Sequence, residues 1–178
     1  MDGRDAMLAV GMNGTPLPVE HGFPVRTVVP GLYGYVSGTK WITELELTSF
    51  ADFDAYWVPR GWSAMGPIKT ESRIDTPTDG KSVNAGSVTI AGVAWAQHRG
   101  ISKVEVRVDN DAWQTAKLDA VPSIDTWRQW FLTWNATPGS HQLQVRATDN
   151  AGQTQTSVQA DPAPNGASGY HTINVTVR

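Results

Sequence analysis

Apolar and polar residues alternate regularly along the second half of the chain. Every second residue is apolar in three runs, which contain Val104, Val106 and Val108, then Leu143, Val145 and Ala147, then Ile173, Val175 and Val177. A period of two with one polar face is the pattern of a strand that lies between a core and water. The β-type runs SVTIAGVAW, WQTAKLD and TWRQWFLTW, with turn residues between them, extend the series. We therefore predict an immunoglobulin-like antiparallel β-sandwich over residues 69–178.

The tryptophans of TWRQWFLTW limit how this run can lie in a sheet. Trp127 and Trp130 differ in parity, so Trp127, Trp130 and Trp134 cannot all face one side of a regular strand. Either one of them lies outside the core or a bulge interrupts the strand. We expect these indoles to serve the core or an interface rather than a ligand site.

The first 68 residues have a different pattern of predicted secondary structure. Residues 5–12 (DAMLAVGM) predict a short helix, because Asp5 can cap it, Met7, Leu8 and Met12 form an apolar stripe, and Asn-Gly follows as a stop signal. Extended segments are expected at PVRTVVPG and TKWITELELTSF, and a loop at YWVPRGWSAMGPIK. A helix with no residues ahead of it to pack against predicts a larger upstream domain. We therefore interpret residues 1–68 as an incomplete α+β piece.

Composition narrows the function classes. The chain has 178 residues, 14 basic and 17 acidic, and its net charge of −3 argues against nucleic acid as a partner. The cysteine count is 0, which excludes disulfides, thiolate zinc sites and cysteine nucleophiles within this sequence. No apolar run is long enough to span a bilayer, and the start lacks the features of a signal peptide. The chain itself is expected to be soluble, and the compartment is left open.

Candidate chemistry is concentrated in VEHGFPVRTVVPG and the lysine that follows it. Gly22 and Pro24 fix the backbone between His21 and Arg26, and Lys40 adds a second permanent cation. A guanidinium and an ammonium suit a phosphate or another oxyanion. A structural explanation remains open, in which the arginine lies on the polar face of a strand and the histidine bonds a loop carbonyl.

A second cluster is aromatic. Tyr56, Trp57, Arg60 and Trp62 could form a wall for a small anion or a sugar, or could seal a junction between two domains. The sequence contains no Ser-His-Asp order, phosphate-binding glycine loop or metal-binding helix motif. We therefore assign no catalytic residue and no metal ligand.

The stretch LAVGMNGTPLPVEHGFPVRTVVPGLYGYVSGTKW resembles the end of the molybdopterin-binding domain in the sulfite oxidase family. MNG-PLP, HGFPVR, VVPG and KW follow one another there in the same order. VTIAGVAW, KVEVRVDNDAWQTAKL, WRQWFLTW and PNGASGYHTINVTV resemble that family's C-terminal dimerisation domain. Together the two resemblances cover nearly the whole chain.

The resemblance implies that His21, Arg26 and Lys40 contact the pterin cofactor and its phosphate. It implies that residues 1–68 end a molybdopterin-binding oxidoreductase domain and that residues 69–178 form a dimerisation domain. In the intact enzyme, molybdenum held by molybdopterin would exchange an oxo group and electrons with a small-molecule substrate. The implied partners are a second copy, bound through the sandwich, and an upstream cofactor domain.

Departures from the family pattern refine these expectations. The family's molybdenum-ligating cysteine has no counterpart here, so the isolated chain is expected to hold no cofactor and to be inactive. Pro59 aligns with a substrate-pocket tyrosine and Asn165 with an arginine, which favours a substrate other than sulfite. The alternative is a free-standing adhesion or carbohydrate-binding module of immunoglobulin-like fold without catalysis.

Overall fold

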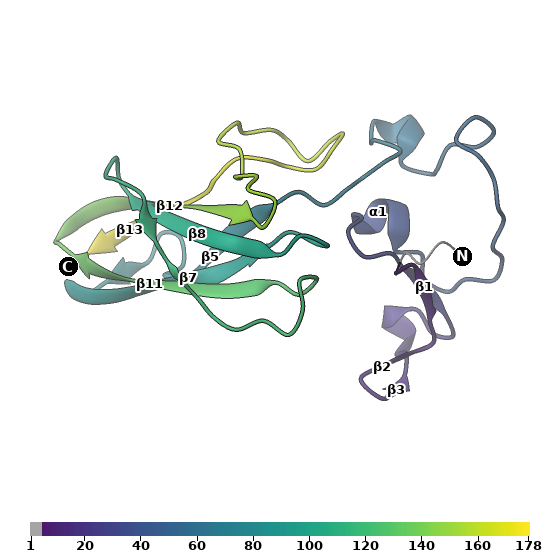
Figure 1. The fold of residues 1–178 in the computed structure, drawn as a ribbon, viewed down its shortest axis with the longest axis horizontal. Helices are drawn as coiled ribbons and strands as arrows, with labels where there is room; N and C mark the ends of the chain where they lie inside the picture. Colours follow the sequence, from purple (N-terminus) through teal and green to yellow (C-terminus); the bar gives the residue numbers. More distant parts are fainter. Residues whose placement is uncertain (1–4) are drawn as a thin grey trace. The chain divides into compact units, whose positions relative to one another are not determined.

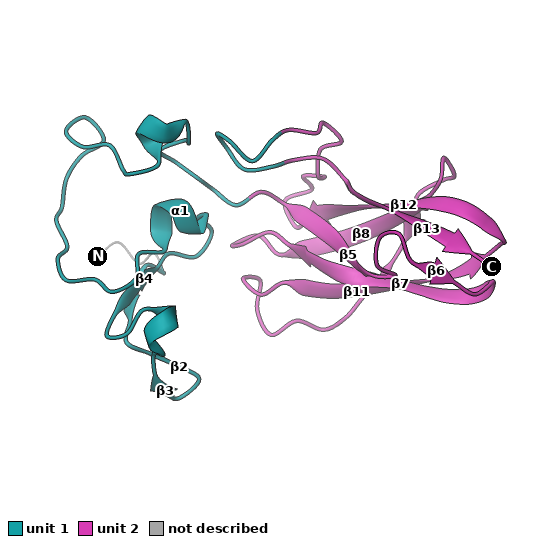
Figure 2. Cartoon of the chain, turned by 180° about the vertical axis from the view of Figure 1, so that it is seen from behind, with its two compact units in different colours: residues 1–68, 161–167 teal, residues 69–160, 168–178 magenta. Residues whose placement is uncertain are grey.

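The computed structural model describes residues 5–178 of the chain. The chain forms two compact units (Figure 2). Unit 1 comprises residues 1–68 with Asp161–Ala167, and unit 2 comprises Lys69–Ala160 with Ser168–Arg178. The late segment is tied to unit 1 by a hydrogen bond from the Ser63 amide to the Pro164 carbonyl at 2.9 Å.

Unit 2 is the β-sandwich that the alternating pattern predicts (Figure 1). Its strands, in chain order, are β5 (Glu71–Thr76), β6 (Ser82–Val83), β7 (Gly86–Trp95), β8 (Ile101–Val108), β9 (Gln114–Thr115), β10 (Lys117–Leu118), β11 (Arg128–Ala136), β12 (Gly139–Asp149) and β13 (His171–Val177). One sheet has the order β10-β11-β7-β5 and the other has the order β6-β13-β12-β8-β9. Strand β6 pairs in parallel with β13, and the other pairs described in these sheets are antiparallel. The predicted fold class, mainly β with an immunoglobulin-like sandwich, is confirmed.

The core lies between the two sheets and uses the alternating residues. One sheet contributes valine, leucine, isoleucine and alanine side chains from β8, β12 and β13, and the other contributes residues such as Ile90, Ala94 and Trp130. Each fully buried aliphatic side chain of this kind stabilises the fold by roughly 1.5–3 kcal/mol. Glu105, which the alternation places on the polar face, is also buried, because Arg146 and Lys103 both contact its carboxylate.

The three tryptophans separate as parity requires. Trp130 is 2% exposed and Trp134 is 8% exposed, and both belong to the core cluster. Trp127 is 60% exposed and precedes the first residue of β11. One indole therefore lies outside, and β11 pairs with β7 through an unbroken register from Arg128 to Ala136.

Unit 1 contains short elements. They are β1 (Met7–Ala9), β2 (Gly11–Met12), β3 (Thr15–Pro16), the 3₁₀ turn η1 (Val19–His21), β4 (Arg26–Val28), α1 (Gly34–Ser37) and the 3₁₀ turn η2 (Val58–Arg60). Strand β1 pairs antiparallel with β4, and β2 pairs antiparallel with β3. The extended segment predicted at PVRTVVPG is therefore present as β4.

The helix predicted over residues 5–12 is wrong. Met7–Ala9 instead forms β1, because its backbone groups find partners in β4, which a local pattern cannot reveal. Asn13 and Gly14 have φ values of 52° and 79°, and they connect β2 to β3. An Asn-Gly pair in this conformation is a hairpin turn, so the signal interpreted as a helix stop marks a hairpin.

The extended strand predicted at TKWITELELTSF is not formed either. Between Ile42 and Ser49 the described chain has no regular secondary structure. Ile42 donates its amide to the Val25 carbonyl at 3.1 Å, and the pairing ends there.

Candidate functional site

Three side chains converge on the turn η1. Its first carbonyl oxygen accepts a hydrogen bond from Trp41 Nε1 at 2.8 Å, its second from Lys40 Nζ at 2.8 Å, and its third from Arg26 Nη1 at 3.2 Å. The histidine at the end of this turn is His21, whose residue is exposed. The structure thus brings together His21, Arg26 and Lys40, which the sequence analysis selected.

Gly22 permits this convergence. Its φ is +115°, and a Cβ added there would lie 3.0 Å from Arg26 Cβ and 3.2 Å from Lys40 Cβ. The two cationic residues come from adjacent stretches, since the Thr27 amide donates to the Thr39 carbonyl at 2.9 Å. Only glycine combines this backbone conformation with so close an approach of two side chains.

The cations retain hydrogen-bonding capacity. Arg26 Nε is buried and has no hydrogen-bond partner within the described part of the chain. A guanidinium carries five N–H donors and an ammonium three, and the carbonyls of η1 take one bond from each group. Bonds to carbonyls give Arg26 and Lys40 a structural role, and the remaining donors can serve an oxyanion.

The aromatic residues of unit 1 form a packed group. The Arg60 guanidinium lies 3.6 Å from the Tyr56 ring centroid and donates to the Tyr56 carbonyl at 2.6 Å. Trp57 meets Tyr56 edge-on at 5.2 Å, and Trp62 contacts Trp57 at 6.3 Å and Tyr35 at 4.7 Å. Arg60 is therefore held over an aromatic ring. Both interpretations of this group, as a wall for a small anion or a sugar and as a domain junction, stay predictions.

Comparison with known proteins identifies the family. Residues 1–57 match the oxidoreductase molybdopterin binding domain, and residues 71–145 match the bacterial Ig domain. Mitochondrial sulfite oxidase of Homo sapiens is 32% identical over 85% of this chain and 32% of its own length. Sulfite oxidase of Gallus gallus is 29% identical over 85% of this chain and 38% of its own length. The sulfane dehydrogenase SoxCD from Paracoccus pantotrophus has a similar structure, with a TM-score of 0.75 and 25% identity, covering 98% of this chain and 51% of that chain.

The chain belongs to the sulfite oxidase family of molybdopterin oxidoreductases. It spans about a third of the length of the curated sulfite oxidases that it matches. The family resemblance drawn from the sequence motifs is confirmed. His21, Arg26 and Lys40 all lie within the residues that match the molybdopterin binding domain. None of the helices in the described part of the chain is long and apolar enough to cross a membrane.

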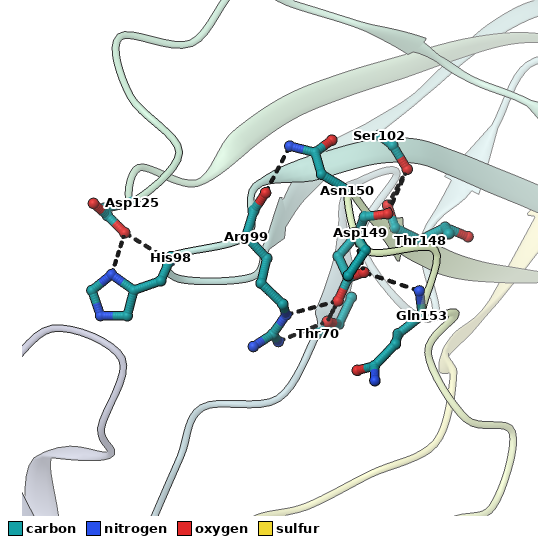
Figure 3. Close-up of polar contacts among 10 residues, drawn as sticks. Thr70, His98, Arg99, Ser102, Asp125, Thr148, Asp149, Asn150 and Gln153 are labelled. Atoms are coloured by element: carbon teal, nitrogen blue, oxygen red, sulfur yellow. Dashed lines mark hydrogen bonds and ion pairs between the residues drawn. The ribbon is translucent and has the colours of Figure 1, made fainter.

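In this sulfite oxidase family member, a buried carboxylate ties the start of the sandwich to the end of β12 (Figure 3). The Asp149 side chain is 0% exposed. One carboxylate oxygen accepts bonds from the Thr70 hydroxyl and Arg99 Nε, both at 2.8 Å, and the other accepts the Ala151 and Gln153 amides, both at 3.0 Å. Burial alone would raise the pKa of Asp149, but these hydrogen bonds outweigh it and hold the pKa below its usual value.

Further bonds fix the groups around Asp149. Arg99 Nη2 donates to the Thr70 hydroxyl at 3.0 Å, and Asn150 Nδ2 donates to the Arg99 carbonyl at 2.6 Å. Ser102 Oγ donates to the Asp149 carbonyl at 2.8 Å (Figure 3). The sequence analysis saw only turn residues in DNAGQ and missed this network. A buried, paired aspartate cannot be told from a surface turn aspartate by residue type alone.

Two histidines of the sandwich have structural partners. His141 Nδ1 lies 2.8 Å from Asp109 Oδ2, and its Nε2 lies 2.9 Å from the Thr137 carbonyl oxygen. Both partners are acceptors, so the bond to Asp109 raises the pKa of His141 and favours the doubly protonated ring. His171 Nδ1 instead accepts the Ile74 amide at 3.1 Å, and burial lowers the pKa of His171. Neither ring is arranged as a metal ligand.

Glu71 is the strongly shifted carboxyl of unit 2. Burial raises the pKa of Glu71 to about 7, against the opposing effects of Lys69 and of a bond from Gln155. Gln155 Nε2 donates to Glu71 Oε2 at 2.7 Å and to the Gly169 carbonyl at 2.8 Å. Because the pKa of Glu71 is higher in the folded than in the unfolded state, its ionisation opposes folding as the pH rises through 7.

We expect Glu71→Gln to stabilise the sandwich at pH 8 and to have little effect at pH 5. At pH 8 the substitution removes a charge that the partly buried site disfavours, by about 1 kcal/mol after allowance for solvent screening. At pH 5 the folded protein already holds the proton. Urea unfolding at the two pH values measures the difference, with Glu44→Gln, at an exposed position, as the control. Equal effects of Glu71→Gln at both pH values would contradict the assigned pKa.

Proposed function

We propose that this chain supplies one wall of the cofactor site in a molybdopterin-dependent oxidoreductase, and that His21, Arg26 and Lys40 bind the anionic part of the cofactor. The observation that carries the proposal is the convergence of two permanent cations beside Gly22, with Arg26 Nε buried and without a partner among the described residues. A buried donor that lacks a partner is costly unless a ligand satisfies it.

The residues present fit the phosphate and pterin of such a cofactor. Arg26 offers a planar set of donors that suits two oxygens of one anion, and Lys40, whose Cβ also lies beside Gly22, offers a point charge. His21 lies at the end of the same turn. When bound, the molybdenum cofactor supplies oxygen-atom and electron transfer. The chain has 0 cysteines, so we assign it no thiolate ligand to the metal.

The role of these protein groups is to position the cofactor and to neutralise its negative charge. The bonds from Lys40 and Arg26 to the carbonyls of η1 orient both cations beside this turn without a ligand. Preorganised cations lose less side-chain entropy when an anion binds. Several large apolar side chains of unit 1 are exposed, including Leu8, Phe23 and Phe50. This supports a cofactor domain that is completed by further polypeptide.

Arg26→Ala should lower the pterin content of the enzyme with a complete cofactor domain at least about tenfold, because a charge-assisted hydrogen bond contributes roughly 1.5–3 kcal/mol. Arg26→Lys should give an intermediate loss, since it keeps the charge but not the planar donor set. Fluorescence of the released, oxidised pterin and elemental molybdenum provide readouts that do not depend on turnover.

Arg60→Ala is the matched control, because Arg60 lies in unit 1 but stacks on Tyr56 rather than on η1. Its pterin content should equal that of the unsubstituted protein. An unchanged pterin content in Arg26→Ala would contradict the assignment of Arg26 to cofactor binding. The chain of 178 residues by itself is expected to hold no stoichiometric pterin, and full occupancy would show that this wall is a competent site alone.

The substrate and partner remain proposals. Pro59 and Asn165 both lie in unit 1. The resemblance pairs them with a tyrosine and an arginine of the sulfite oxidases, and this difference supports a small substrate other than sulfite. We propose a homodimer through the sandwich, which sedimentation over a range of concentrations tests. The free-standing carbohydrate-binding or adhesion module is not favoured, because the family matches account for unit 1 as well as for the sandwich.

A further inference from the structure

Two arginines on the sheet that contains β8 and β12 lie over one tryptophan ring. Arg107 is on β8 and Arg146 is on the neighbouring strand β12 (Figure 1). Their guanidinium carbons lie 4.8 Å and 4.3 Å from the centroid of the Trp113 ring, and Tyr170 meets this ring edge-on at 5.3 Å. The residues before and after each arginine belong to the core, so both arginines lie on the outer face of the sheet. We call these four residues the arginine–tryptophan cluster.

The charges on this outer face do not cancel. Within β8 and β12, Lys103, Arg107 and Arg146 share a single carboxylate on this face, that of Glu105. Its two oxygens lie 3.2 Å from Lys103 Nζ and 2.9 Å from Arg146 Nε. Arg107 has no carboxylate partner in the described part of the chain, and it donates both Nε and Nη2 to the amide oxygen of Gln144. A chain with a net charge of −3 therefore presents a face with an excess of positive charge.

Arg107 is held in place and still has free donors. Gln144, which accepts its bonds, is itself fixed, because Gln144 Nε2 donates to Thr172 Oγ1 at 3.1 Å. The guanidinium has further N–H groups on its two terminal nitrogens, and these form a fork that matches the two oxygens of a carboxylate. Since its orientation is set before binding, Arg107 loses less side-chain entropy when an anion binds.

We propose that the arginine–tryptophan cluster is a docking site for an acidic segment of a partner polypeptide, in which a carboxylate binds Arg107 beside the Trp113 ring. Tryptophan, tyrosine and arginine are the residue types that contribute most binding energy at protein interfaces. The excess positive charge of this face complements aspartate and glutamate side chains. The inference does not depend on the cofactor site, because all four residues of the cluster lie in unit 2.

A second copy of the chain is a poor partner for this face. In a twofold pair the same surface patch of both copies meets. The arginines of one cluster would then approach those of the other, and like charges brought together at an interface are unfavourable. An acidic segment meets no such repulsion, so the charge of the face favours a different polypeptide.

Fluorescence anisotropy of a labelled, capped hexaglutamate peptide, titrated with the whole chain at low salt, tests the inference. Arg107→Gln should weaken binding about fivefold, because an exposed ion pair contributes up to about 1 kcal/mol. Arg107→Lys should give a smaller loss, since it keeps the charge but not the planar fork. Lys117→Gln is the matched control, because Lys117 lies 5.8 Å from the Phe131 ring in the other sheet. Its affinity for the peptide should equal that of the unsubstituted chain.

Three results would overturn the inference. The first is absence of hexaglutamate binding, or a loss in Lys117→Gln as large as that in Arg107→Gln. The second is equally tight binding of a thymidine hexanucleotide, which would make the face a site for any polyanion. The third is dissociation of a dimer by hexaglutamate in sedimentation, which would assign the face to a contact between copies. Urea unfolding verifies that the variants are folded, and Arg107→Lys provides the comparison if Arg107→Gln is not.

Discussion

Replacing Asp149 by alanine is expected to destabilise the sandwich by about 3–5 kcal/mol, because it leaves the part-exposed Arg99 guanidinium, the Thr70 hydroxyl and two amides without their buried acceptor. The carboxylate is fully buried and bonds Thr70, Arg99, Ala151 and Gln153. Domains of this kind are stable by about 5–15 kcal/mol, so the loss is a large share of the total. Truncation also frees Thr70, which lies directly before β5, from the end of β12.

Urea unfolding followed by far-UV circular dichroism measures this loss. Asp75→Ala is the matched control, since Asp75 pairs with Arg73 at 2.6 Å on the surface and such pairs contribute at most about 1 kcal/mol. The pKa of Asp149 is depressed in the folded state, so its contribution is present above the ordinary aspartate range and is lost as the pH falls below it. The difference in free energy of unfolding between Asp149→Ala and the unsubstituted protein should therefore become smaller at acid pH. A loss no larger than that of Asp75→Ala would show that the network is dispensable.

The sandwich could be predicted because its signal is local. Val104, Val106 and Val108 alternate with polar residues, and burial between two sheets requires that period. Strand β5 (Glu71–Thr76) was missed, since Ile74 is its only large apolar core residue and its edge position needs few others. Short strands of two residues, such as β6, carry no periodic signal at all.

Unit 1 could be predicted only in part because its pairing is not local. The motif residues Arg26 and Lys40 were found by their chemistry, but their bonds to the carbonyls of η1 depend on a fold that brings separate stretches together. The strand β1 has helix-like residues and is held by β4. Residues 43–48 have a strand-like sequence, but the described chain offers them no partner. Pattern indicates which state a segment prefers, and partners decide whether it is reached.

Trp130→Ala is expected to destabilise the sandwich by about 3–5 kcal/mol, whereas Trp127→Ala should change its stability by less than about 0.5 kcal/mol. Trp130 is 2% exposed and packs in the core opposite Gly92, while Trp127 is 60% exposed. Trp130 Nε1 is buried and has no hydrogen-bond partner among the described residues, so the loss comes from packing rather than from a broken bond. Trp130→Phe should therefore recover much of the stability that alanine removes.

The two tryptophans form a matched pair, because they lie three positions apart and undergo the same substitution. Urea unfolding of Trp127→Ala and Trp130→Ala therefore compares one indole inside the core with one outside it. Because both variants replace tryptophan by alanine, the comparison does not depend on side-chain type. Equal losses would mean that Trp127 is also buried in solution, for example against a second copy of the sandwich. In that case its loss should depend on protein concentration, since a contact between copies stabilises by mass action. A large loss at Trp130 alone, independent of concentration, assigns the two indoles to opposite faces of the strand region, as their parity predicts.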